Sequence, residues 1–93
     1  MFRIVFKPLA IRQLKKMKRY YSATIVGAIE KRLSEEPEKI QGAIKRLRGR
    51  QATTFRLRVQ DYRVFYDVIE DRVEVVQVLH KSETAAFYQE EKK

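Results

Sequence analysis

Cysteine is absent from the 93 residues, so the chain can form neither a disulfide nor a metal site with thiolate ligands. No apolar run approaches the roughly 20 residues that span a membrane, and no signal-peptide pattern opens the sequence. Internal repeats and low-complexity segments are also missing. We therefore expect a cytoplasmic protein with no membrane partner and a single domain over residues 1–93.

Acidic residues are scarce relative to basic ones. Twenty-one Lys and Arg against 12 Asp and Glu give a formal net charge of +9. An excess of this size favours polyanionic partners such as RNA, DNA, a ribosome or an acidic protein. The excess is concentrated between residues 45 and 63, where Asp61 is the one acid. The basic residues of this segment are Lys45, Arg46, Arg48, Arg50, Arg56, Arg58 and Arg63.

The clearest local pattern is F-R-L-R-V-Q-D-Y-R-V-F-Y, over residues 55–66. Apolar side chains at positions 55, 57 and 59 alternate with Arg56 and Arg58. Such alternation predicts a strand with one buried and one solvated face. A second strand-like run follows from residue 62 to residue 69.

Between these runs, Gln60-Asp61 interrupts the alternation and predicts a two-residue hairpin loop. This loop pairs Val59 with Tyr62 and sets Arg58 opposite Arg63 on the solvated face. Like charges directly opposite each other are destabilising by up to roughly 1 kcal/mol. The arrangement therefore indicates an anionic ligand between the arginines, although a merely solvated face of a basic protein is the alternative.

The remaining elements follow from periodicity and caps. A short strand near residues 2–6 precedes Pro8, which suits the first turn of a helix with apolar positions 11, 14, 17 and 21. Ser22 is the expected N-cap of a second helix that ends before Pro37, and Gly27 inside it would mark a close helix contact. Residues 38–53 are expected to be mostly irregular.

After the hairpin, a turn at residues 70–71 leads to a strand at 73–79, and Ser82 is expected to cap a short helix at 82–91. Val76 and Val78 shift the alternation of that strand, which indicates burial on both sides. The order predicts an α+β fold: a strand, an antiparallel helical hairpin, three antiparallel strands and a short C-terminal helix. One sheet carries the helices on one face, and the arginines lie on the other, open face.

Three segments resemble the RelE/ParE toxin superfamily, and its RelE branch in particular. They are I-K-R-L-R-G-R at 44–50, F-R-L-R-V-Q-D-Y-R-V-F-Y-D-V at 55–68 and H-K-S-E-T-A-A-F-Y at 80–88. The similarity extends over essentially the whole chain. It implies a toxin of a type II toxin–antitoxin system that cuts mRNA in the ribosomal A site without a metal or other cofactor. It also implies a RelB-like antitoxin partner, the ribosome and mRNA as further partners, and a toxin–antitoxin heterooligomer.

The resemblance also implies site residues. In this family a ribose 2′-OH attacks the adjacent phosphate, which needs a base, an acid and cations for the developing charge. Arg56 and Arg58 stand where the best-known member has lysines, Arg63 matches a phosphate-binding arginine, and Tyr88 matches a tyrosine that contacts the substrate nucleotide. Ser82 departs from the family, since that member has an arginine there that serves as the acid.

Other residues must then carry protons, because arginine stays protonated far above neutral pH. His80 is the single histidine and can act as acid or base. Glu83 is a second candidate base, and Lys81 can replace the missing positive charge. The alternatives are a structural histidine at a strand end, a helix-terminal charge for Glu83, and a core position for Tyr88.

Two other functions stay open on the sequence. The motifs do not by themselves exclude a ParE-like inhibitor of DNA gyrase without nuclease activity, but the arginine-rich open face with His80 nearby favours the nuclease. A non-catalytic RNA-binding module is a third possible function. The chain lacks the motifs of the common RNA-binding domains, which argues against it.

Overall fold

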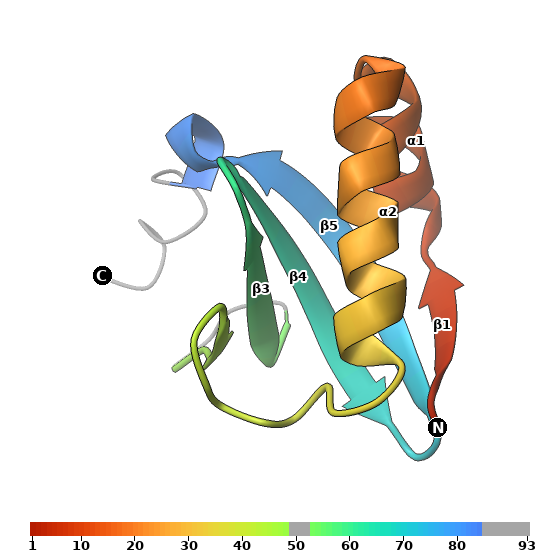
Figure 1. The fold of residues 1–93 in the computed structure, drawn as a ribbon, viewed down its shortest axis with the longest axis vertical. Coiled ribbons are helices and arrows are strands. Elements are labelled where there is room, and N and C mark those ends of the chain that lie inside the picture. The colour runs from red at the N-terminus through yellow and green to blue at the C-terminus, as the bar shows by residue number, and fades with distance from the viewer. Residues whose placement is uncertain (49–52, 85–93) are drawn as a thin grey trace.

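A five-stranded mixed sheet with two helices on one face forms the fold in a computed structural model that describes residues 1–48 and 53–84 (Figure 1). The strand order across the sheet is β1-β5-β4-β3-β2. The elements are β1 (Arg3–Phe6), α1 (Pro8–Lys16), α2 (Arg19–Leu33), β2 (Ile44–Arg46), β3 (Phe55–Val59), β4 (Tyr62–Ile69), β5 (Arg72–His80) and a 3-10 turn (Lys81–Glu83). The α+β class, the helical hairpin on one face and the three antiparallel strands are as predicted. No helix within the described residues is long and apolar enough to cross a membrane.

The β3–β4 hairpin has the register predicted from its alternation. Val59 pairs with Tyr62 and Arg58 with Arg63. Gln60 occupies the first loop position with φ of 54°, a left-handed conformation that most side chains disfavour. The antiparallel pairing of β4 with β5 likewise turns at residues 70–71, where Glu70 has φ of 57°.

β1 is the exception to the antiparallel order, since it pairs with β5 in parallel, from Arg3 beside Arg72 to Phe6 beside Val75. β1 ends before β5 does, and α1 continues the support of β5. The side-chain oxygen of Gln13 in α1 accepts a hydrogen bond of 2.6 Å from the backbone N–H of Val78. A helix side chain thus replaces the missing strand partner.

β2 corrects the expectation that residues 38–53 are irregular. Its three residues pair antiparallel with β3, and Ile44 lies opposite Leu57 with only 2% of its surface exposed. A strand this short carries no period of its own, so its pairing with β3 and the burial of Ile44 stabilise it.

The helix boundaries also differ from the expected ones. α1 ends at Lys16, and Tyr21 belongs to α2, whose N-cap is Lys18 rather than Ser22. Ser22 lies in the first turn, where its hydroxyl donates to the carbonyl of Arg19 at 3.2 Å. The expected close contact at Gly27 is absent, because a Cβ built there meets nothing within 4 Å.

The main core lies between the sheet and the helices. Ile25, Ile29 and Leu33 of α2 pack with the helix-facing residues of β3, β4 and β5. Tyr66 of β4 is fully buried, and its hydroxyl donates to the Pro37 carbonyl at 2.7 Å. This bond ties the connection after α2 to the sheet, and burial raises the pKa of the Tyr66 phenol.

A bulge interrupts the β4–β5 pairing between Phe65 and Tyr66. Phe65 lies opposite Gln77, whereas the next residue, Tyr66, lies opposite Val75. Val76 is therefore the extra residue of β5. The bulge explains the shifted alternation of β5. The predicted burial on both sides also holds near the end of the strand, where Val78 is 2% and Leu79 9% exposed.

Candidate nucleic-acid interface

Two transverse rows of side chains cross the face of the sheet that points away from the helices. The strand registers place Arg56 beside Phe65 and Arg58 beside Arg63 in neighbouring rows. Residues directly opposite each other in a sheet share a face. The first row is Lys45, Arg56, Phe65 and Gln77, and the second is Arg58, Arg63 and Leu79. These seven residues, called the arginine face below, contain four cations and no carboxylate.

Arg63 is the most constrained cation of the arginine face. Its guanidinium donates to the carbonyls of Gln60 and Tyr62, each at 3.0 Å. The hairpin loop thereby orients the side chain, which is half-buried, while its neighbour Arg58 is exposed. Arg63 consequently contributes to the local structure of the loop as well as to the charge of the face.

Arg56 is half-buried in the first row. Its Nε atom is buried and, within the part of the chain that the structure describes, has no hydrogen-bond partner. Buried polar atoms are nearly always paired, so an acceptor brought to this face would meet an available donor. A phosphate oxygen is such an acceptor.

The arginine face is less open than the sequence predicted. Phe65 has none of its surface exposed and Leu79 only 9%, although neither belongs to the core under the helices. The face therefore has a buried apolar centre with cations around it. Phe65 offers no exposed ring for a nucleobase in this conformation.

The remaining predicted phosphate binders lie in different places. Lys45 is in the first row, whereas the register of Arg46 with Phe55 places it on the helix side, where its guanidinium lies 5.9 Å from the Phe55 ring centre. Arg48 is exposed beyond β2. Lys81 contacts Asp61 at 3.5 Å at the hairpin end. Arg50 lies outside the described residues.

His80 and Glu83 are not brought together with the arginines. His80 pairs with Tyr62, whose side chain is on the helix face. The His80 Nδ1 accepts from the Ser82 N–H at 3.1 Å, and Glu83 accepts from the His80 N–H at 2.8 Å. His80 rather than Ser82 is thus the N-cap of the terminal turn, in a reciprocal capping box. Tyr88 lies outside the described residues.

Gln77 is the residue of the arginine face that the sequence analysis missed. It is half-buried, lies in the row of Arg56 and has an amide that can donate and accept. The shifted alternation around Val76 was the available signal, since it moves position 77 onto this face.

At the β1–β5 end of the same sheet face, two basic side chains are paired with an acidic one. Arg72 Nε donates to a Glu74 oxygen at 2.9 Å, and Lys7 lies 3.9 Å from the same carboxylate. The hydrogen bond from Arg72 lowers the pKa of Glu74. Among the described residues, no three His, Asp or Glu side chains are grouped to hold a metal ion.

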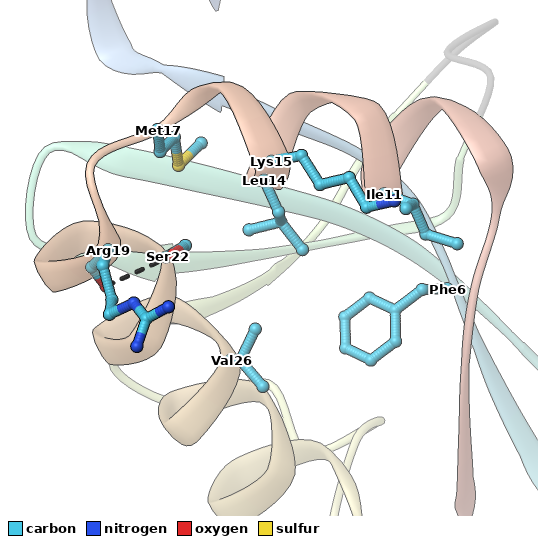
Figure 2. A pocket seen from close by; sticks show the side chains of 8 residues that line it. All are labelled: Phe6, Ile11, Leu14, Lys15, Met17, Arg19, Ser22 and Val26. Atoms are coloured by element: carbon cyan, nitrogen blue, oxygen red, sulfur yellow. Dashed lines mark hydrogen bonds between the residues drawn. The ribbon is translucent and has the colours of Figure 1, made fainter.

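A groove of 470 Å³ between α1 and α2 is the second surface of interest (Figure 2). Phe6, Leu14 and Val26 extend into the space between the two helices, and Lys15 and Arg19 contribute basic groups to its lining. An apolar groove with a basic rim suits an amphipathic, acidic segment of a partner.

Comparisons with known proteins identify the family of this chain. The sequence model of a family described as the ParE toxin of type II toxin–antitoxin systems matches residues 4–85. The toxin–antitoxin complex RelBE2 from Mycobacterium tuberculosis contains a similar chain with 30% identity and a TM-score of 0.75. That alignment covers 85% of this chain and 96% of the other.

Two further solved structures support the fold alone. The RelB–RelE antitoxin–toxin complex from Methanococcus jannaschii has 21% identity and a TM-score of 0.69, covering 90% of this chain and 98% of the other. The isolated RelE toxin from E. coli has 19% identity and a TM-score of 0.69, covering both chains fully. No curated protein matches the sequence significantly.

Proposed function

The chain belongs to the RelE/ParE superfamily of type II toxin–antitoxin toxins, and on this premise we propose that it is an endoribonuclease. Its substrate is mRNA in the A site of cytoplasmic ribosomes. The observation that carries the proposal is the arginine face, where Arg56, Arg58 and Arg63 lie beside one another on adjacent strands.

The proposed reaction is an attack of a ribose 2′-OH on the neighbouring phosphorus. A bond forms from the 2′ oxygen to phosphorus and the bond to the 5′ oxygen breaks, while the 2′-OH loses its proton to water and the leaving 5′ oxygen takes one from water. Negative charge grows on the non-bridging oxygens in between. Preorganised cations that meet this charge lower the barrier.

Arg63 suits this role best, because Gln60 and Tyr62 orient its guanidinium before the substrate arrives. Arg58, directly opposite, supplies a second positive charge, and Arg56 supplies a donor that has no partner in the described residues. None of the three is a proton carrier at neutral pH. In this proposal they bind the phosphate and stabilise its charge.

The predicted proton carriers receive different roles. His80 and Glu83 form the capping box of the turn Lys81–Glu83 at the end of β5, so we assign them a structural role there. Tyr88 keeps the substrate contact that its sequence match implies. Lys81, which pairs with Asp61 beside the hairpin, contributes positive charge at the end of the sheet where Arg58 and Arg63 lie.

The proposal includes an antitoxin partner, because similar solved chains occur in toxin–antitoxin complexes. The groove between α1 and α2 would hold the apolar residues of an antitoxin segment (Figure 2). Ile11 in this groove and Leu9 on the other side of α1 are equally exposed, at 39% and 38%. Ile11→Glu should therefore weaken binding to the co-expressed antitoxin, while Leu9→Glu should not.

Purified protein added to programmed ribosomes tests the proposed activity. We expect cleavage of the mRNA within the A-site codon, and no cleavage of the same mRNA free in solution. Cleavage of free mRNA at the same rate as ribosome-bound mRNA would contradict the substrate assignment.

Inhibition of DNA gyrase is the second candidate function, because the matching family model is described by the ParE toxin. A gyrase inhibitor needs a binding surface and no preorganised charge for a phosphate. Supercoiling assays with purified gyrase distinguish the two. Loss of supercoiling together with intact mRNA on ribosomes would establish the gyrase function instead.

A further inference from the structure

A second pocket lies on the helix side of the sheet, behind the hairpin end of the arginine face. Its volume is 620 Å³, which is in the range of small-ligand sites. One side of α1, the start of α2, the last pair of β4 and β5 and the 3-10 turn line it. Its lining residues are Leu9, Gln13, Lys16, Met17, Lys18, Tyr21, Tyr62, Val78, His80 and Glu83.

The rings of Tyr21, Tyr62 and His80 form one wall of this pocket, and Tyr20 extends their series outside it. The ring centres of Tyr20 and Tyr21 are 5.3 Å apart, those of Tyr21 and Tyr62 are 5.9 Å apart, and those of Tyr62 and His80 are 5.3 Å apart. Tyr21 keeps 40% of its surface exposed although it lies against this series. An exposed ring held in place by its neighbours is a ready stacking surface.

Positive charge lies beside the aromatic wall. Lys16 and Lys18 line the pocket, and both are exposed. The one carboxylate of the lining, Glu83, already accepts a hydrogen bond from the backbone of His80. Rings next to cations match a ligand that combines a flat base with a phosphate.

We propose that this pocket binds one unstacked nucleotide of single-stranded RNA. The base stacks on Tyr21, whose ring lies against Tyr62, and its phosphate contacts Lys16 and Lys18. Stacking on aromatic side chains beside a basic groove is the general way in which proteins hold single strands without sequence preference. The site does not depend on cleavage, because none of these residues lies on the arginine face.

The position of the pocket extends the path available to RNA. Tyr62 and His80 form the pair next to that of Arg63 and Leu79, on the reverse side of the sheet. A strand that leaves the arginines around the hairpin end therefore reaches the pocket. The two sites together would hold RNA on both sides of this end of the sheet.

Neighbouring residues provide matched variants for the test. Tyr21 lines the pocket, whereas Tyr20, although 68% exposed, does not. Lys16 lines it, whereas Lys15 lines the groove between the helices. The probe is a heptameric oligouridine RNA, with affinity measured by fluorescence anisotropy for each variant and by chemical shifts of the isotope-labelled protein.

Tyr21→Leu should weaken oligouridine binding about 5-fold or more, the scale of one lost base stack, and Tyr20→Leu should leave it within about 2-fold. Tyr21→Phe should retain binding, which separates a lost ring from a disturbed fold. Lys16→Gln should weaken binding more than Lys15→Gln. Chemical shifts should move at Tyr21, Tyr62 and His80 in the wild type.

Equal effects of Tyr21→Leu and Tyr20→Leu would overturn the proposal. So would a Tyr21→Leu protein that binds RNA normally but loses its antitoxin, since the pocket would then be a site for an acidic peptide. Cleavage at saturating ribosome concentration is a separate readout. If it is absent in the wild type while oligouridine binding needs Tyr21, the nuclease proposal fails and the pocket stands.

Discussion

The two ends of the helix-free sheet face carry similar numbers of cations in different settings. At the β1–β5 end, Arg72 and Lys7 share the carboxylate of Glu74. At the hairpin end, Arg58 and Arg63 lie directly opposite each other, and the arginine face has no acid. Both ends belong to one sheet, so backbone geometry does not account for the difference.

The comparison separates charges that support the fold from charges that oppose it. A paired cation contributes a little stability, whereas like charges opposite each other cost some. The hairpin end places Arg58 opposite Arg63 and, in addition, orients Arg63 with two carbonyls. A polyanionic ligand would add favourable contacts with both arginines at this end.

Substitution of Arg63 should reduce the cleavage rate far more than substitution of a cation at the β1–β5 end. Arg63→Ala should lower the single-turnover cleavage rate on programmed ribosomes by roughly 10²- to 10³-fold, the scale for one preorganised charge-stabilising group. Arg63→Lys should recover only part, because lysine lacks the planar fork. The matched control is Arg3→Ala, at the β1 edge of the same face, which should keep the wild-type rate.

Stability must be measured beside the rate. The lost bonds to Gln60 and Tyr62 offset the relief of repulsion, so Arg63→Ala should change the free energy of unfolding by no more than about 1 kcal/mol. A protein that is strongly destabilised, yet cleaves in proportion to its folded fraction, would make Arg63 structural.

The salt dependence of RNA affinity should respond to a lost cation at the hairpin end and not to one at the β1–β5 end. Arg58→Ala should reduce the slope of log affinity for single-stranded RNA against log salt by roughly 0.7, the value for one phosphate contact. Arg3→Ala should leave the slope unchanged. Equal slopes for both variants would place the RNA away from the arginine face.

An acid introduced at the hairpin end should make it resemble the other end. Gln77→Glu places a carboxylate in the row of Arg56. We expect RNA binding to weaken several-fold and the free energy of unfolding to rise by a few tenths of a kcal/mol. The isosteric control is Gln77→Met, and RNA binding that is weakened equally in both variants would indicate lost packing or a lost amide contact instead of charge.

Removal of an acid at the β1–β5 end should have the smallest effect. Arg72 lowers the pKa of Glu74 below its ordinary 4.5, so this pair contributes stability above that pH and loses it as the pH falls through the lowered pKa. Glu74→Gln should therefore flatten the acid side of the melting-temperature profile, below about pH 4.5, and leave cleavage at pH 7 unchanged. If Glu74→Gln leaves the melting temperature at acidic pH unchanged, the Arg72–Glu74 pair is not formed in solution.

Local signals in the sequence predicted the hairpin and its facing arginines correctly. The alternation around Arg56 and Arg58 and the break at Gln60 define the β3–β4 register without long-range information. The parallel pairing of β1 with β5 joins segments about seventy residues apart, and no local pattern encodes it. β2 was missed for a related reason, since its partner strand stabilises it.

One bulge decides on which face of the sheet His80 lies. Counted from the turn at residues 70–71, a regular hairpin would pair Arg63 with Val78 and leave His80 on the arginine face. The extra residue at Val76 shifts the partners, so that Arg63 meets Leu79 and His80 meets Tyr62 on the helix face. The sequence contained the sign of this shift, but burial on both sides explained it equally well.

Mapping of mRNA 5′ ends in cells that express the chain without an antitoxin tests the central claim most directly. Wild-type protein should produce new ends at A-site codons, these should vanish when translation of the message is blocked, and Arg63→Ala should not produce them. New ends that persist without translation, or growth arrest with intact mRNA and inhibited gyrase, would contradict the account.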